Sequence, residues 1–136
     1  MIALVGLLAV ACTKPQSAVK ALDGQWNVTS MTVSEHGKTM DLVTLGLEGE
    51  YTFNKCKLKD EEFCDMTVKT TFGGDSSTES AVFKVTDNGT KLVMAESDTS
   101  SAEDQTTINI VELSRKNAKF TQTEDGGTTE IVLEKK

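Results

Sequence analysis

Short segments in which apolar and polar residues alternate make up most of this chain, and turn residues separate them. Ala81, Phe83 and Val85, for example, are each separated by one residue, which is the period of a β-strand with one buried face. Residues 87–90 follow directly, and their Asn-Gly pair tolerates the positive φ angles of a type I′ hairpin turn. The pattern therefore predicts antiparallel strands joined by short turns.

Eight such segments can be recognised, and no segment keeps the period of a helix long enough to predict one. We therefore predict an all-β protein, an eight-stranded antiparallel up-and-down β-barrel, with a two-sheet sandwich as the alternative. Closure into a barrel is preferred because it leaves no sheet edge exposed. Residues 40–47 are apolar enough to pack across a barrel mouth as a lid or one helical turn. The predicted strands lie at residues 26–33, 50–57, 63–72, around 81–85, around 92–94, 106–113, around 118–120 and around 131–133.

The only tryptophan, Trp26, stands at the head of the first segment, where so large an apolar side chain can close one end of a barrel. Trp26 and Val28 share one face of this strand, whereas Met31 and Val33 fall on the opposite parity, which predicts either a β-bulge or a change of exposure between them. The inward positions of all strands either line a ligand cavity or simply form a packed core. The candidate ligand-binding residues are Trp26, Val28, Tyr51, Phe53, Met66, Val68, Phe83, Val85, Met94, Ile110 and Phe120, and further inward candidates are Leu92, Ile108, Ile131 and Leu133.

The N-terminal segment has the composition of a targeting sequence. Residues 2–11 are apolar or small without interruption, which is too short to span a bilayer but suits the core of a secretory signal. Ala9 and Ala11 before Cys12 resemble the lipobox of bacterial lipoproteins, whose cysteine is lipidated after cleavage; the alternative is a plain cleaved signal with an incidental cysteine. The resemblance implies a lipoprotein signal peptide over residues 1–11, a lipidated Cys12 and flexible tether over residues 12–21, and a folded domain over residues 22–136.

The other two cysteines, Cys56 and Cys64, flank a polar segment whose acidic centre suits a hairpin tip. Two cysteines on neighbouring strands favour a structural disulfide in an oxidising compartment. A metal site is the poorer interpretation, because His36 is the only histidine and the spacing matches no zinc pattern. No nucleophile elbow such as G-x-S-x-G accompanies His36. We predict no metal, no cofactor and no enzymatic activity.

The charge balance constrains the partners. The chain carries 14 basic and 21 acidic residues, which gives a net charge of −7. This charge repels phosphate groups and argues against nucleic acid and against a charged membrane-binding face. An acidic surface can complement a basic protein partner, such as a cell-wall hydrolase.

The segment Gly24-Gln25-Trp26 on the first predicted strand resembles the G-x-W motif of lipocalins. Together with the lipobox, residues 51–54 and residues 129–133, the wider pattern is similar to bacterial lipocalin-like lipoproteins and spans most of residues 20–136. The resemblance implies a barrel that holds a small hydrophobic ligand. It also implies a late arginine packed over the tryptophan, for which Arg115 is the candidate.

Residues 13–15 after Cys12 contain no aspartate, which by resemblance to lipoprotein sorting implies the outer membrane, facing the periplasm, with surface exposure possible. The sequence therefore predicts a lipid-anchored, lipocalin-like binding protein of the bacterial cell envelope. The alternative is a periplasmic protein-interaction module, or an inhibitor of a cell-wall hydrolase or protease, whose barrel core is filled.

Overall fold

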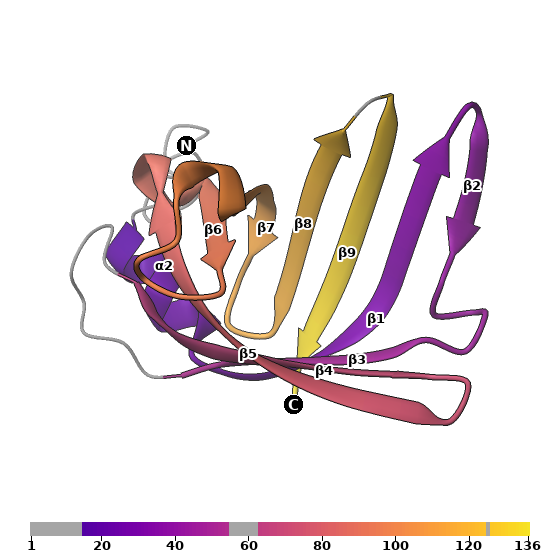
Figure 1. Cartoon of the computed structure of the whole chain (residues 1–136), viewed down its shortest axis with the longest axis horizontal. Coiled ribbons are helices and arrows are strands. Elements are labelled where there is room, and N and C mark those ends of the chain that lie inside the picture. The colour runs from indigo at the N-terminus through magenta and orange to yellow at the C-terminus, as the bar shows by residue number, and fades with distance from the viewer. Residues whose placement is uncertain (1–14, 55–62, 125) are drawn as a thin grey trace, which may run out of the picture.

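Most of the chain lies in β-strands (Figure 1). The computed structural model describes residues 15–54, 63–124 and 126–136. The predicted segments form strands because their alternation buries one face of each strand and leaves the other in solvent. The elements are α2 (Pro15–Leu22), β1 (Gly24–Glu35), β2 (Lys38–Asp41), β3 (Glu48–Phe53), β4 (Cys64–Phe72), β5 (Asp75–Thr86), η1 (Asp87–Gly89), β6 (Lys91–Ala95), η2 (Ala102–Asp104), β7 (Thr106–Leu113), β8 (Asn117–Glu124) and β9 (Gly127–Lys135).

Strand β1 closes the sheet into a barrel, because it pairs with both β3 and β9. Strands β3 to β9 follow in chain order around the barrel, and every neighbouring pair is antiparallel. Eight strands form the closed barrel, and β2 is attached to β1 outside it. The prediction of an all-β, eight-stranded up-and-down barrel is confirmed, and the sandwich is excluded.

Strand β1 changes partners along its length. Residues 24–27 pair with β3, whereas residues 32–35 pair with β2 on the same side. On its other side β1 pairs with β9, and the register shifts between Val28 and Ser30. The predicted β-bulge is therefore confirmed, and it lets one long strand curve enough to serve three neighbours.

Residues 40–47 form the predicted helical turn only in part. Two consecutive i→i+3 hydrogen bonds, from the N–H of Leu45 to the carbonyl oxygen of Leu42 and from the N–H of Gly46 to that of Val43, make one tight turn, and Val43 packs against the core. The first residues of this segment belong to β2, which extends the sheet along β1, and the turn follows. Met40 is 53% exposed and Leu45 is 56% exposed, so neither side chain covers the barrel. The β2 strand was not predicted, because its pairing with the far half of β1 depends on tertiary geometry, which an apolar count does not reveal.

The carboxylate of Asp41 holds β1, β2 and this turn together. Its Oδ1 accepts hydrogen bonds from the backbone N–H of Met31 at 3.3 Å and of Val43 at 3.0 Å, and its Oδ2 accepts one from the Ser30 hydroxyl at 3.2 Å. Partial desolvation raises the pKa of Asp41, but these hydrogen bonds outweigh it and hold the pKa below its ordinary value.

Helix α2 replaces part of the predicted flexible tether. Ala18, Val19 and Leu22 are buried, which is the one-sided spacing of a short amphipathic helix. Eight residues are too few for a helix to be stable alone, so packing against the barrel supplies its stability, and local pattern did not predict it. The rest of the tether and Cys12 lie outside the described residues. No helix in the described part of the chain is long and apolar enough to cross a membrane.

The turn between β5 and β6 confirms the hairpin prediction. Asn88 has φ 56° and Gly89 has φ 84°, the positive values that both central residues of a type I′ turn require. The backbone N–H of Thr90 donates to the carbonyl oxygen of Asp87 at 3.2 Å. This turn places β5 and β6 side by side at the end of the barrel where α2 packs.

The two ends of the barrel differ. We call the end covered by α2 the closed end; the open end is the opposite one, where the hairpins β1–β2, β4–β5 and β8–β9 turn (Figure 1). Residues 75–80 of β5, toward the open end, are all exposed, whereas residues 81–86 are buried or half-buried. The buried core thus occupies the closed half of the barrel, and the strands continue beyond it.

Candidate functional site

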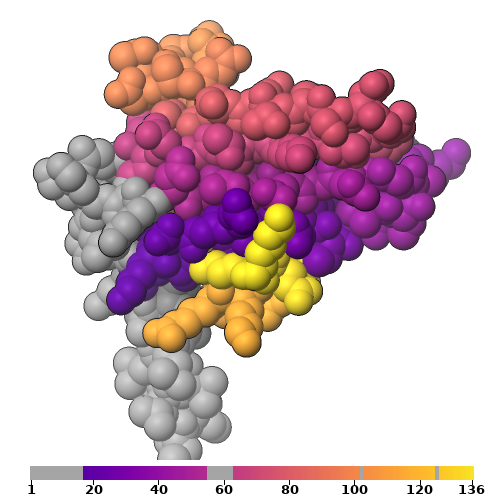
Figure 2. Space-filling view, turned by 90° about the horizontal axis from the view of Figure 1, so that it is seen from below, coloured from indigo at the N-terminus to yellow at the C-terminus, as the bar shows by residue number. Residues whose placement is uncertain are grey.

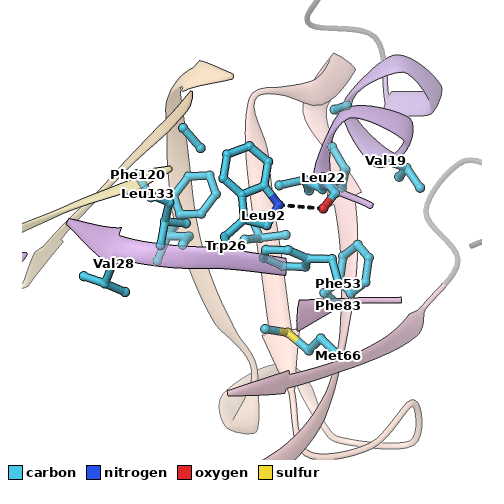
Figure 3. Close-up of a cluster of buried hydrophobic side chains, with 14 residues drawn as sticks. Val19, Leu22, Trp26, Val28, Phe53, Met66, Phe83, Leu92, Phe120 and Leu133 are labelled. Carbon is cyan, nitrogen blue, oxygen red and sulfur yellow. Dashed lines mark hydrogen bonds between the residues drawn. The ribbon is translucent and has the colours of Figure 1, made fainter. Parts of the chain in front are cut away.

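A packed cluster of buried side chains fills the closed half of the barrel (Figure 3). Leu22 of α2 reaches this cluster from outside the strands and is fully buried. Phe53 and Phe83 meet edge to face, with ring centroids 5.0 Å apart and an interplanar angle of 77°. This cluster is the floor of the barrel interior. Its largest fully buried members are Trp26, Phe53, Phe83, Phe120, Leu22, Met66, Leu92, Leu133 and Val85.

Trp26 links the floor to the helix that covers it. Its indole Nε1–H donates a hydrogen bond of 2.8 Å to the carbonyl oxygen of Leu22, which lies in the last turn of α2 (Figure 3). Lys135 Nζ lies 5.0 Å from the centroid of the indole ring and donates to the carbonyl oxygen of Ala21 at 2.9 Å. The indole and the ammonium group together satisfy two carbonyl groups that the helix end leaves without internal partners.

A second layer of apolar side chains lies above the floor, toward the open end, and each of them is only half-buried. Strand pairing places them on the inward face: Tyr51 pairs with Val68, Met66 of the floor pairs with Ala81, and Phe120 of the floor pairs with Ile131. We call this layer the inner ring. Its members are Met31, Tyr51, Val68, Ala81, Met94 and Ile131.

Tyr51 is the inner-ring residue that packs against the aromatic part of the floor. Its ring centroid lies 6.2 Å from that of Phe53 on the floor. Burial raises the pKa of the Tyr51 phenol above its ordinary value, because the phenolate would lose hydration there. The Tyr51 side chain is therefore largely desolvated, although it is not fully covered.

A hollow of about 630 Å³ opens beside the inner ring, between the middle of β5, the end of β6 and the start of β7. Ala81 and Met94 of the inner ring belong to its lining. Glu79, Glu96 and Asp104 also line it, so the hollow joins an apolar base to three carboxylates. Such an arrangement suits a molecule with an apolar part and a polar part.

The chain matches no protein-family model and no curated protein. Its structure is similar to that of a lipocalin-like protein from Bacteroides uniformis ATCC 8492, with a TM-score of 0.53 and 15% sequence identity. The alignment covers 85% of this chain and 99% of that one.

The fold is lipocalin-like. At this level of sequence identity the similarity concerns the fold alone. The resemblance to lipocalin-like proteins that Gly24-Gln25-Trp26 suggested is confirmed at the level of the fold, and Trp26 is buried on the barrel floor.

The cation over the tryptophan of this lipocalin-like barrel is Lys135 and not the predicted Arg115. Arg115 is exposed in the turn between β7 and β8. Lys135 lies on the last strand, β9, and is directly opposite Trp26 in the pairing of β1 with β9. The expectation of an arginine did not identify Lys135, although a lysine at this position can place its ammonium group over the same face of the indole ring.

The eleven residues predicted to bind a ligand fall into two groups in the lipocalin-like barrel. The first group is buried in the packed floor and is not available to a ligand without repacking: Trp26, Val28, Phe53, Met66, Phe83, Val85 and Phe120. The second group is half-buried: Tyr51, Val68 and Met94 belong to the inner ring, and Ile110 lies nearer the closed end than the buried Ile108 of β7. Alternation alone predicted the inward face correctly, but it did not predict the depth at which the core ends.

Sequence reasoning missed part of the open end. Ala81 and Met31 of the inner ring were not among the candidate ligand-binding residues. Ala81 shares the inward parity of Phe83, whereas Met31 faces inward because the register of β1 shifts between Val28 and Ser30. The three carboxylates of the hollow come from β5 and from the connection between β6 and β7. No local motif marks them, because strand pairing brings them together.

The remaining predictions concern cysteine, histidine and metal chemistry. Cys64 is half-buried at the start of β4, but Cys56 lies outside the described residues, so the disulfide stays a prediction. His36 is exposed in the β1–β2 turn, with Nε2 3.5 Å from Glu35 Oε1. No group of three or more His, Cys, Asp or Glu residues within the described ranges could hold a metal ion. The predictions of no metal, no cofactor and no enzymatic activity also stay predictions.

Proposed function

We propose that this lipocalin-like protein binds a small amphipathic molecule at the open end of its barrel. The apolar part of the molecule lies on the inner ring, and the polar part lies in the hollow beside it. One observation carries the proposal: an inward layer of apolar side chains is left half-covered above a packed floor, next to a hollow of about 630 Å³. Covering this layer stabilises a complex by about 25 cal/mol per Å² of apolar surface removed from water.

The charges around the site select the polar part of the ligand. Glu79, Glu96 and Asp104 line the hollow, and no lysine or arginine lines it among the described residues. A carboxylate on the ligand meets these three negative charges across a short distance and is disfavoured. The site therefore favours a neutral or positively charged head group over a fatty acid.

The protein acts, in this proposal, while attached to the bacterial cell envelope. Support comes from the sequence, in which Cys12 follows a lipobox-like segment and is joined to α2 by two residues. The expected location is the outer membrane, facing the periplasm. Mass spectrometry of the protein isolated from a bacterial host tests this directly. Acylation at Cys12 is expected, and the Cys12→Ser variant is expected to lack the added acyl mass.

The test of ligand binding uses two probes with the same apolar body, retinol with a hydroxyl head and retinoic acid with a carboxylate. Retinol is expected to bind at least about ten-fold more tightly than retinoic acid, which corresponds to about 1.4 kcal/mol. Ala81→Trp adds bulk at the base of the hollow and is expected to weaken retinol binding by a similar factor. Val111→Trp is the matched control, because Val111 is 58% exposed.

Equal retinol affinity in Ala81→Trp and Val111→Trp would place the ligand elsewhere. Retinoic acid binding as tightly as retinol would refute the assignment of the head group to the carboxylates. Absence of binding of both probes, together with a native mass spectrum free of any co-purified molecule, would remove the proposal altogether.

The second candidate is an inhibitor of a basic cell-wall hydrolase or protease. The observation that favours it is the exposure of large apolar side chains near the open end, with Met40 53%, Leu45 56% and Phe72 51% exposed. Such side chains beside carboxylates can form the centre of an interface with a basic partner. Retention of lysozyme on the immobilised protein, and its loss in Leu45→Ser, would support this candidate; no retention of any basic hydrolase would end it.

A further inference from the structure

Basic side chains gather on one face of the closed end. The ends of β7 and β9 and the last turns of α2 surround a hollow of about 920 Å³ there. In Figure 2 the indigo, orange and yellow segments of this underside lie next to one another. Five basic residues line the hollow, and Glu134 is the one acidic residue among its described lining. We call these five residues the basic face: Lys20, Arg115, Lys116, Lys135 and Lys136.

Three of these cations point to an external partner. Lys20, Arg115 and Lys116 are exposed. The turn that carries Arg115 and Lys116 is held by Ser114 Oγ and by backbone groups, so its geometry does not need these two side chains. By contrast, Lys135 is engaged with Trp26 and Ala21, and Lys136 Nζ lies 2.6 Å from Glu50 Oε2.

The basic face also lies close to the point where the chain leaves the barrel. Cys12 is three residues before Pro15, the first residue of α2, and three extended residues span at most about 11 Å. Helix α2 packs against η1, β5 and β7 at the closed end. A lipid on Cys12, as in the proposed function on which this step rests, would hold the closed end at the membrane surface.

We propose that the basic face binds anionic phospholipid head groups, so that the closed end faces the membrane and the open end faces away. A single lipid chain anchors a protein only marginally, and a cluster of cations supplies the second attraction. The net charge of −7 argued against a charged membrane-binding face. The net charge does not decide the attraction of one face to a membrane. Salt screens charges that are more than about 8 Å away, so the cations nearest the membrane dominate that attraction.

The experiment uses the full 136-residue chain with Cys12→Ser, which cannot be acylated, and two kinds of vesicle. One kind is phosphatidylcholine alone, and in the other a third of the lipid is phosphatidylglycerol. Co-sedimentation is expected to be stronger with phosphatidylglycerol, and this difference is expected to vanish in high salt. Apolar insertion of the N-terminal segment contributes equally to both vesicles and cancels in the comparison.

The variant Arg115→Gln/Lys116→Gln is expected to lose about ten-fold or more of the phosphatidylglycerol-dependent binding, since each cation near an anionic surface contributes about five-fold. Lys38→Gln/Lys69→Gln, which removes the same charge from exposed residues of β2 and β4, is the matched control and is expected to change it little. Equal losses in the two variants, or no dependence on phosphatidylglycerol, would overturn the proposal. Because the readout needs neither acylation nor retinol, it separates failure of this proposal from failure of the proposed function.

Discussion

Strand β5 crosses both halves of the barrel, and its two parts differ in what stabilises them. In the closed half, Phe83 and Val85 are fully buried in the floor. In the open half, residues 75–80 are exposed on both faces, yet they keep a continuous antiparallel register with β4. Main-chain hydrogen bonds thus extend the strand where burial has stopped. The comparison teaches that side-chain burial stabilises the closed half of the barrel, whereas main-chain pairing alone extends the strands into the open half.

The largest expected effect follows from removing the side chain that joins the floor to α2. Trp26→Ala should lower the free energy of unfolding by about 3–5 kcal/mol, because it leaves a large cavity in a packed core. Trp26→Phe should cost less, about 1–3 kcal/mol, since it keeps a ring but leaves the carbonyl oxygen of Leu22 without its 2.8 Å donor. Urea denaturation measures both. If Trp26→Ala lowered the free energy of unfolding by less than Trp26→Phe does, the assignment of stability to the closed half would be contradicted.

A steric effect of intermediate size is expected where Val28 packs over Gly49. A Cβ added to Gly49 would lie 2.8 Å from Cγ2 of Val28, which is too close for any real contact. Gly49→Ala should therefore cost about 1–3 kcal/mol. Adding Val28→Ala removes the clashing methyl group, so the double variant should be more stable than the sum of the two single losses predicts. Strict additivity in urea denaturation would mean that the close approach is not what restricts this position.

A smaller effect distinguishes Lys135 from Arg115. Lys135→Met removes the ammonium group from the indole face and from the carbonyl oxygen of Ala21, and should cost about 1 kcal/mol. Arg115→Met alters an exposed turn and should change stability by less than about 0.5 kcal/mol. Thermal unfolding of the two variants side by side measures the difference. Equal effects would show that the cation–indole contact contributes nothing to the closed end.

The smallest expected effect depends on pH and belongs to the edge of the open half. The folded-state pKa of Asp41 is lowered by its hydrogen bonds, so its contribution to stability is present above the unfolded value of about 3.9 and is lost as the pH falls through the folded value. Asp41→Asn should therefore be less stable than the wild type at neutral pH, and the gap should close in acid. A gap that stays constant down to the acid transition would contradict this role for the carboxylate.

The barrel could be predicted from the sequence because its strands alternate cleanly, as in residues 81–86, and because the Asn-Gly turn sets one hairpin register. Helix α2 could not be predicted from the sequence, because so short a helix is stable only when Leu22 packs on the floor. Pairing of β2 with the far half of β1 depends on the path of β1 after its bulge. The local sequence pattern does not predict the contact of α2 with the floor or that of β2 with β1.

The candidate site was harder to predict than the fold for a related reason. Alternation identifies inward positions such as Phe83 and Met94 alike, but only the packed structure separates a buried floor residue from a half-buried one of the inner ring. Lys135 lies far from Trp26 in sequence, and the closing pair β1–β9 brings them together. The depth of burial and the closing strand pair are tertiary properties, so local pattern does not predict them.

Amide hydrogen exchange along β5 tests the difference between the two halves most directly. The amides of Phe83 and Val85 should exchange only through global unfolding, whereas those of residues 75–80 should open locally and exchange at least about a hundred-fold faster. That result would place the stable core at the closed end and leave the open end available to a ligand. Uniformly slow exchange over the whole of β5 would contradict the account, because the open half would then be as firmly held as the closed one.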